Sequence, residues 1–413
     1  MEKMDVDEAT ELQGAIDWAH SIQKRQAETL MAAVARNAGT EDMDPDYRKG
    51  LLQLALDAGV DQDITERMFN HPKLEKVSEF DEPDVRRASN DLVEMLTKTM
   101  SSAGMSTGGR KLLVSSLASG QVNALCATNT WDEKYYHVFI DSDLTVFCNS
   151  VGKLVAECLV RDNMATGEVD LDPAKIAGNV QSDDIQKRAA DLFCSTVLKG
   201  TPRASEPWLP TVESFELALL LTNALNMFPI AHELGHLHLG HLESDETRQV
   251  SVEGIEELDA AVYSQKDEFA ADSVGATVTN QTMIRLEASN AFTFLAPYIF
   301  LKSVEVLDAC YEVYDEHAGA MSFTHPSAQE RAQRIRTVLI MHAQYHNSGK
   351  ILPLALRAID LICHGLGLAA LTNLQSLKSK GKTPRERIRL SVSECGRPRI
   401  LGFFPNRDPD TTR

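Results

Sequence analysis

The sequence predicts a mainly helical α+β fold with one small antiparallel sheet. Apolar residues recur at helical spacing through most of the 413 residues. Two runs, Val122 to Thr128 and Tyr135 to Ile140, instead combine β-prone side chains with a short polar connection, which indicates an antiparallel hairpin. A hydrophobic content of 43% is enough for a large buried core. We therefore expect helices to pack around this hairpin.

Three regions follow along the chain. They are a helical N-terminal region (1–110), a central domain (111–345), and a C-terminal helix with a flexible tail (346–413). In the first region Leu12, Ile16 and Ile22 share one helical face, and the small residues of 101–109 are typical of a linker. The N-terminal helices show no chemistry of their own, so we expect either a structural role or a surface for a regulatory partner.

Composition narrows the class of protein. The net charge of −19, without a sustained basic run, argues against binding to nucleic acid. The seven cysteines occur singly, without a C-x-x-C pair, so neither a disulfide framework nor a thiolate zinc site is predicted. The first seven residues are acidic rather than typical of a secretory signal. We expect a soluble, cytoplasmic protein.

Apolar stretches in the chain are expected to form buried helices rather than membrane spans. A spanning helix needs about 20 predominantly apolar residues. The three longest candidates are either too short or interrupted by polar and charged residues: 217–230, 291–301 and 351–371.

The segment His232-Glu233-Leu234-Gly235-His236 is the clearest chemical signal. On a helix, histidines four residues apart lie on one face and can share a metal ion, while the intervening glutamate projects toward bound water. Zn²⁺ is the metal that this arrangement favours, with one position left open for water. Gly235 would let another element approach this helix closely.

A third metal ligand is needed, and four candidates compete: His238, His241, a distant histidine or a downstream carboxylate. On a continuous helix His238 and His241 point away from the face of the first two histidines. Glu268 and Asp272 are four residues apart on a later predicted helix, beyond an acidic loop (243–257) that would reverse the chain. We therefore expect Glu268 to be the third ligand and Asp272 to orient a ligand imidazole.

Three motifs in this order resemble the gluzincin metallopeptidases with a second E-x-x-A-D motif, the group of the CAAX prenyl proteases and HtpX. The motifs are His232 to His236, Glu268 to Asp272, and Thr324 to Ile335, which is similar to T-H-P-x-x-x-x-R. The segment His232 to His241 also resembles soluble ImmA/IrrE-type and Lit-type peptidases. The resemblance covers about residues 215–340 and implies a zincin-like core. Relatives of the first group are mostly membrane-embedded or exported, unlike the protein expected here.

The expected function is that of a zinc metalloendopeptidase acting on intracellular protein substrates. The resemblance makes His232, His236 and Glu268 the zinc ligands and Glu233 the general base, which agrees with the chemistry of the residues. His325 is either a stabiliser of the developing oxyanion or a histidine at a helix start. The edge of the predicted hairpin is a candidate site for pairing with an extended peptide substrate. The alternative is a catalytically silent, zinc-bearing binding or regulatory protein.

Overall fold

The computed structural model describes most of the chain. The described residues are 6–27, 45–60, 62, 82–117, 122–128, 134–159, 169, 171–243, 248–252, 255–314, 326–345, 351–384, 389–392 and 398–401. Within them the protein is mainly helical with a small three-stranded sheet, as the sequence predicts. The expected tail from residue 405 lies outside the described residues.

The sheet is mixed, not purely antiparallel. Strands β2 (Ala124–Thr128) and β3 (Tyr135–Asp141) form the predicted antiparallel pair, with Cys126 opposite Val138. Strand β1 (Lys111–Leu117) was not predicted, and it pairs in parallel with the other side of β3. The order β1-β3-β2 leaves β2 at one edge of this sheet. The prediction of an antiparallel sheet was therefore wrong for β1, because parallel strands pair over a long connection that local patterns do not reveal.

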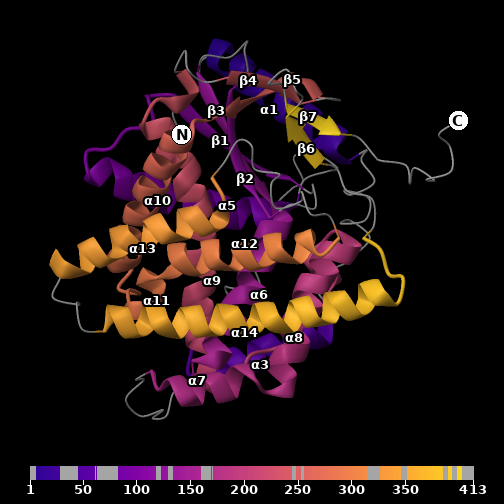
Figure 1. Cartoon of the computed structure of the whole chain (residues 1–413). Helices are drawn as coiled ribbons and strands as arrows, with labels where there is room; N and C mark the ends of the chain where they lie inside the picture. Colours follow the sequence, from indigo (N-terminus) through magenta and orange to yellow (C-terminus); the bar gives the residue numbers. More distant parts are fainter. Residues whose placement is uncertain are drawn as a thin grey trace, which may run out of the picture.

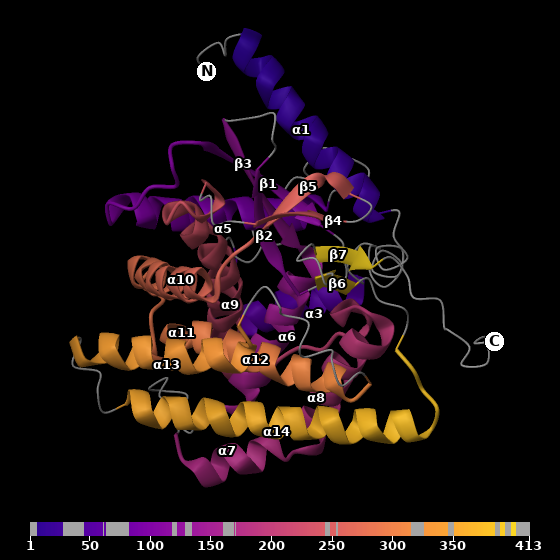
Figure 2. The ribbon, with the colours of Figure 1, turned by 45° about the horizontal axis from the view of Figure 1, so that its top comes forward.

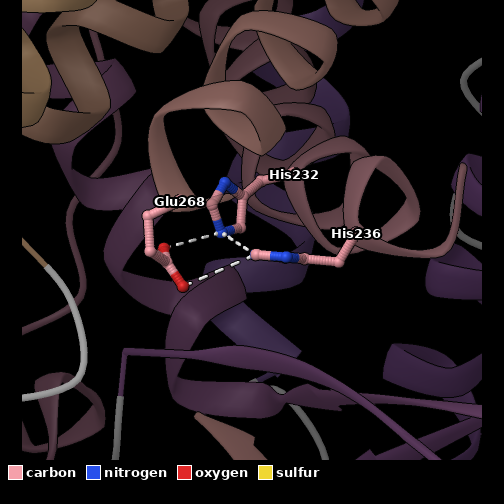
Figure 3. Close-up of side chains that lie close together, drawn as sticks. All are labelled: His232, His236 and Glu268. Carbon is pink, nitrogen blue, oxygen red and sulfur yellow. Dashed lines mark hydrogen bonds and ion pairs between the residues drawn. The ribbon is translucent and has the colours of Figure 1, made fainter. Parts of the chain in front are cut away.

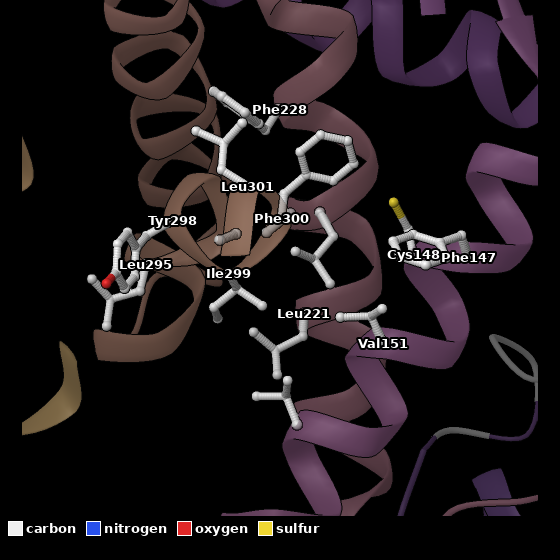
Figure 4. Close-up of a cluster of buried hydrophobic side chains, with 14 of the residues drawn as sticks. Phe147, Cys148, Val151, Leu221, Phe228, Leu295, Tyr298, Ile299, Phe300 and Leu301 are labelled. Atoms are coloured by element: carbon white, nitrogen blue, oxygen red, sulfur yellow. The ribbon is translucent and has the colours of Figure 1, made fainter. Parts of the chain in front are cut away.

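Helix α9 (Val212–His238) is the central element of the fold. Every residue from 224 to 237 is buried, and apolar side chains occupy all sides of this part of the helix. Helix α6 (Ser142–Cys158) packs on one side of α9 and α12 (Ala296–Glu312) on another. Figure 4 shows this core, where Phe228 and Phe300 meet edge to face with ring centroids 5.7 Å apart. Burial on all sides therefore anchors the part of α9 that carries the histidines.

Helix α10 (Gln265–Arg285) lies against the C-terminal part of α9 (Figures 1 and 2). Glycines allow this close packing. A Cβ atom at Gly275 would lie 2.9 Å from the backbone nitrogen of His232, and one at Gly235 would lie 3.0 Å from the backbone oxygen of Ala271. A capping box at Ser264 and Asp267 starts α10. The two helices therefore meet backbone to backbone at the histidine-bearing segment.

The chain between α9 and α10 forms a hairpin rather than the expected acidic loop. Strands β4 (Arg248–Val252) and β5 (Ile255–Val262) pair antiparallel, and β5 lies near β2. The prediction that 243–257 is a loop was wrong because it weighed the acidic residues and overlooked the alternation of valine with polar residues at 248–252.

One hydrophobic core joins parts of all three predicted regions. Helix α5 (Pro83–Ser102) contributes Val93, Leu96 and Met100 to it, and α14 (Leu352–Ser379) contributes a row of buried residues from Leu352 to Leu374. Helix α1 (Val6–Ala27) covers the sheet through Trp18 and Ile22. The predicted boundaries near 110 and 345, and the regulatory role of the N-terminal helices, stay predictions.

The remaining elements complete the shell around this core. They are α3 (Pro45–Asp57), α7 (Pro173–Val180), α8 (Asp183–Cys194) with a π-turn at Ser195–Lys199, short 3-10 turns at Pro202–Ala204 and His241–Glu243, α11 (Ala291–Phe294), α13 (Ala328–Tyr345), β6 (Arg389–Val392) and β7 (Pro398–Leu401).

Two helices of the described chain are long and apolar enough to cross a membrane. They are α9, whose most apolar window is 72% buried inside the protein, and α14, whose window is 50% buried. Core helices of soluble proteins meet the same criteria, so the expected lack of a membrane span stays a prediction.

Candidate metal centre

Three buried side chains from α9 and α10 converge on one point. His232 and His236 lie one turn apart on α9, and Glu268 faces them from the first turn of α10 (Figure 3). Their ligand atoms all lie within 4.8 Å of one another. Glu268 and His236 are 0% exposed and His232 is 5% exposed. This group could bind a metal ion.

The distances within the group fit a tetrahedral metal. Two ligand atoms bound to tetrahedral zinc lie roughly 3.3 Å apart, since each is about 2.0–2.1 Å from the ion. The two Nε2 atoms of His232 and His236 are 3.1 Å apart. Oε2 of Glu268 lies 3.4 Å from Nε2 of His232, and the other carboxylate oxygen, Oε1, lies 3.5 Å from Nε2 of His236. All three separations are within about 0.3 Å of that value.

Asp272 orients His232 from the side opposite the proposed metal position. Its Oδ1 lies 2.9 Å from Nδ1 of His232, so the imidazole donates its Nδ1 proton there and turns the Nε2 lone pair toward Glu268. Arg331 of α13 in turn donates to both oxygens of Asp272, at 2.9 and 2.7 Å. A bidentate pair of this kind fixes the carboxylate, and through it the ring.

His241 plays the corresponding part for His236. Gly240, at φ +70°, takes the left-handed conformation that turns the chain after α9, and this turn brings His241 back toward His236. The two Nδ1 atoms are 2.9 Å apart, and Nε2 of His241 lies 3.5 Å from Asp267. We assign the proton between the two Nδ1 atoms to His236. With that proton on Nδ1, the Nε2 atoms of both His232 and His236 are unprotonated, and each carries a lone pair. Two lone pairs 3.1 Å apart repel each other unless a cation lies between them.

The electrostatics of the site favour a cation. Burial and Arg331 lower the pKa of His232, but Asp272 and Glu268 raise it by more, to about 9. Burial raises the pKa of Asp272, yet Arg331 and His232 together hold it below its usual range. Burial also lowers the pKa of His241 more than Asp267 and Glu268 raise it, which suits a neutral acceptor. Nε2 of His232 therefore attracts either a proton or a metal ion at neutral pH.

Glu233 lies at the same site, between the histidines and the sheet. Its Oε1 is 4.0 Å from Nε2 of His232, and its Oε2 accepts a hydrogen bond of 2.8 Å from the backbone N–H of Cys126. Since Cys126 belongs to the edge strand β2, the sheet positions this carboxylate. Burial and the charge of Glu233 raise the pKa of the Cys126 thiol well above its usual range.

Tyr263 closes the site beside His236. It immediately precedes Ser264, the N-cap of α10, and its ring stacks on the His236 imidazole with centroids 3.6 Å apart and planes 15° apart. Its hydroxyl is buried without a hydrogen-bond partner among the described residues. Burial and the charge of Glu233 raise the pKa of the phenol well above its usual range, so the hydroxyl keeps its proton at neutral pH.

The structure thus brings together five residues selected from the sequence: His232, Glu233, His236, Glu268 and Asp272. His325 lies outside the described residues. His238 points elsewhere, toward the backbone of Ser106.

Sequence reasoning missed the contacts that Tyr263, Cys126 and His241 make at this site. Arg331 and Arg334 both belong to the third motif, but only Arg331 binds Asp272, whereas Arg334 lies over the Phe269 ring. The roles of Tyr263 and Cys126 carry no sequence signal, because each depends on chain segments that meet only after folding. For His241, the glycine before it was the available clue.

Comparisons with protein-family models, curated proteins and solved structures find no match to this chain.

Proposed function

We propose that the protein is a zinc-dependent endopeptidase. The observation that carries the proposal is that Glu233, and no fourth metal-ligand group among the described residues, lies beside the three converging side chains. A structural zinc site is closed by four protein ligands, whereas a catalytic site keeps three and an open position. Glu233 is not one of the three grouped ligands, so its carboxylate is available to act as the base in hydrolysis.

Zinc fits the donor set best. Two imidazoles and one carboxylate in tetrahedral spacing match a catalytic zinc site, and oxygen-rich sites for Mg²⁺ or Ca²⁺ would offer no imidazole. When bound, the metal supplies a Lewis acid that acidifies water and polarises the scissile carbonyl. His232, His236 and Glu268 would hold it.

Glu233 then acts as the proton carrier. Its Oε2 is held by the Cys126 N–H, which leaves Oε1, the oxygen 4.0 Å from His232, to take a proton from the attacking water. The same carboxyl group passes that proton to the leaving amine. The pairing of substrate backbone with β2 is part of this proposal, since β2 is an outer strand of its sheet and its Cys126 N–H contacts Glu233.

The family assignment belongs to the same proposal. The metal ligands, base and orienting aspartate occupy two adjacent helices, α9 and α10, in the order typical of gluzincins with an E-x-x-A-D motif. Arg331 matches the arginine of the third motif, and its two bonds to Asp272 give that residue a physical role. A zincin-like core and intracellular protein substrates follow from this proposal.

Replacing Glu233 with Gln tests the proposal directly. The purified wild type should contain one zinc per chain by metal analysis and should cleave proteins in a denatured-protein mixture. Glu233→Gln should keep the zinc and lose activity by at least about 100-fold, because the general base contributes this much. Glu213→Gln, an exposed carboxylate in the first turn of the same helix, is the matched control and should stay active.

The alternative function, a catalytically silent zinc-bearing protein, leads to the opposite expectation. If stoichiometric zinc is present but wild type and Glu233→Gln give the same cleavage products, the chain is a binding or regulatory protein. If no zinc binds, both functions are wrong.

A further inference from the structure

Tyr263 has a buried hydroxyl that the fold leaves unused. The side chain is 8% exposed, and the oxygen has no hydrogen-bond partner among the described residues. Buried polar groups nearly always find a partner, so an exception at a chemical site calls for a functional explanation. Tyr263 directly precedes Ser264, the N-cap of the helix that carries Glu268.

The surroundings of Tyr263 place it at the reaction centre rather than in the general core. Its ring stacks on the ligand imidazole of His236 at 3.6 Å. The charges of Glu233 and Glu268 act on its phenol, as does Cys126 of the edge strand. The phenol is thus flanked by a metal ligand, the base and the strand proposed to bind substrate.

We propose that the Tyr263 hydroxyl donates a hydrogen bond to the scissile carbonyl oxygen as negative charge develops on it. This inference rests on the proposed peptidase function. When water adds to the carbonyl carbon, the π electron pair of C=O moves to the oxygen and the water proton moves to Glu233. Tyr263 keeps its own proton throughout. A donor fixed before the reaction stabilises this charge without reorganising, which is why such donors act mainly in the transition state.

A purely structural role for Tyr263 makes a different prediction. In that case the ring serves only to pack against His236, and the hydroxyl is incidental. Tyr263→Phe separates the two roles because it keeps the stacked ring and removes the oxygen alone. Tyr314→Phe is the matched control, since it removes a hydroxyl that donates to the Leu374 carbonyl between α12 and α14.

The experiment uses the full zinc-loaded chain and a fluorogenic peptide built around a bond that the wild type cleaves in a denatured-protein mixture. Tyr263→Phe should lower kcat by about 100-fold or more, as expected for one lost donor, and change KM by less than about threefold. The Kd for zinc, from chelator competition, should change by less than about threefold. A phosphinic pseudopeptide of the same sequence imitates the tetrahedral state, so its affinity should fall by about the same factor as kcat.

Each other result overturns the inference. An unchanged kcat or unchanged pseudopeptide affinity in Tyr263→Phe would show that the hydroxyl donates nothing, while leaving the peptidase function intact. A parallel loss of zinc would show a structural role. Failure of the wild type to hydrolyse any bond in a Glu233-dependent manner overturns the peptidase function and this inference with it.

Discussion

Replacing Gly275 with Ala tests whether the metal centre depends on the close approach of α9 and α10. A Cβ atom at this position would lie 2.9 Å from the backbone nitrogen and 3.0 Å from the Cα atom of His232. Carbon atoms in good contact are about 3.5–4.0 Å apart. The helices must therefore separate by roughly 0.5–1 Å, because a backbone atom cannot rotate away as a side chain can.

This separation acts on the metal site directly. Gly275 lies two helical turns after Glu268 on the same face of α10, so a shift at Gly275 moves Glu268 away from His232 and His236. Metal–ligand distances tolerate only about 0.2 Å. We expect zinc affinity to fall by about 10-fold or more, and the free energy of unfolding of the metal-free protein to fall by about 1–3 kcal/mol, which is typical of overpacking.

Urea unfolding of the metal-free chain and chelator competition for zinc measure the two effects separately. Gly178→Ala is the control, because Gly178 is an exposed glycine within α7 whose added Cβ would have no atom within 4 Å. That variant should be up to about 1 kcal/mol more stable, since alanine favours a helix over glycine. If Gly275→Ala retained wild-type stability and zinc affinity, close helix packing would not be what holds the site together.

Two further predictions follow from named contacts. Asp272→Asn removes the charge that orients His232 and binds Arg331, so the Kd for zinc should rise by about 10- to 100-fold, and an unchanged Kd in chelator competition would contradict the role of Asp272. His137 is buried, neither ring nitrogen has a hydrogen-bond partner in the described part of the chain, and burial lowers its pKa from 6.5 to about 4. As the pH falls, His137 therefore becomes protonated in the unfolded chain before it does so in the folded chain. The free energy of unfolding should fall by up to roughly 3 kcal/mol as the pH drops from about 6.5 to about 4. His137→Phe should remove this part of the pH dependence in urea unfolding, and an identical pH profile would refute the assignment.

Local spacing was enough to predict most of the metal group. His232 and His236, and likewise Glu268 and Asp272, are four residues apart, and helical geometry places such pairs on one face wherever the helix lies. Gly235 also predicted a close approach, and the structure places both Gly235 and Gly275 at the contact between the two helices. The antiparallel hairpin of β2 and β3 was predicted for the same reason, since its signal is contained in one short segment.

Spacing failed where two distant segments meet. The parallel pairing of β1 with β3 joins Lys111 to Tyr135 across a connection that has no hairpin signal. His241 was set aside as a ligand on the premise of a continuous helix, but α9 ends at His238 and the turn at Gly240 brings His241 to His236.

The sequence by itself determined which groups are available for chemistry: two imidazoles and three carboxylates, each on a helix whose period fixes its direction. Only the tertiary structure decided how these groups are held. The Cys126 N–H reaches Glu233 across 107 positions, and Arg331 reaches Asp272 across 59. The physical reason is that helical periodicity is a local property of the backbone, whereas the contacts that orient a metal ligand or a base arise from packing between distant segments.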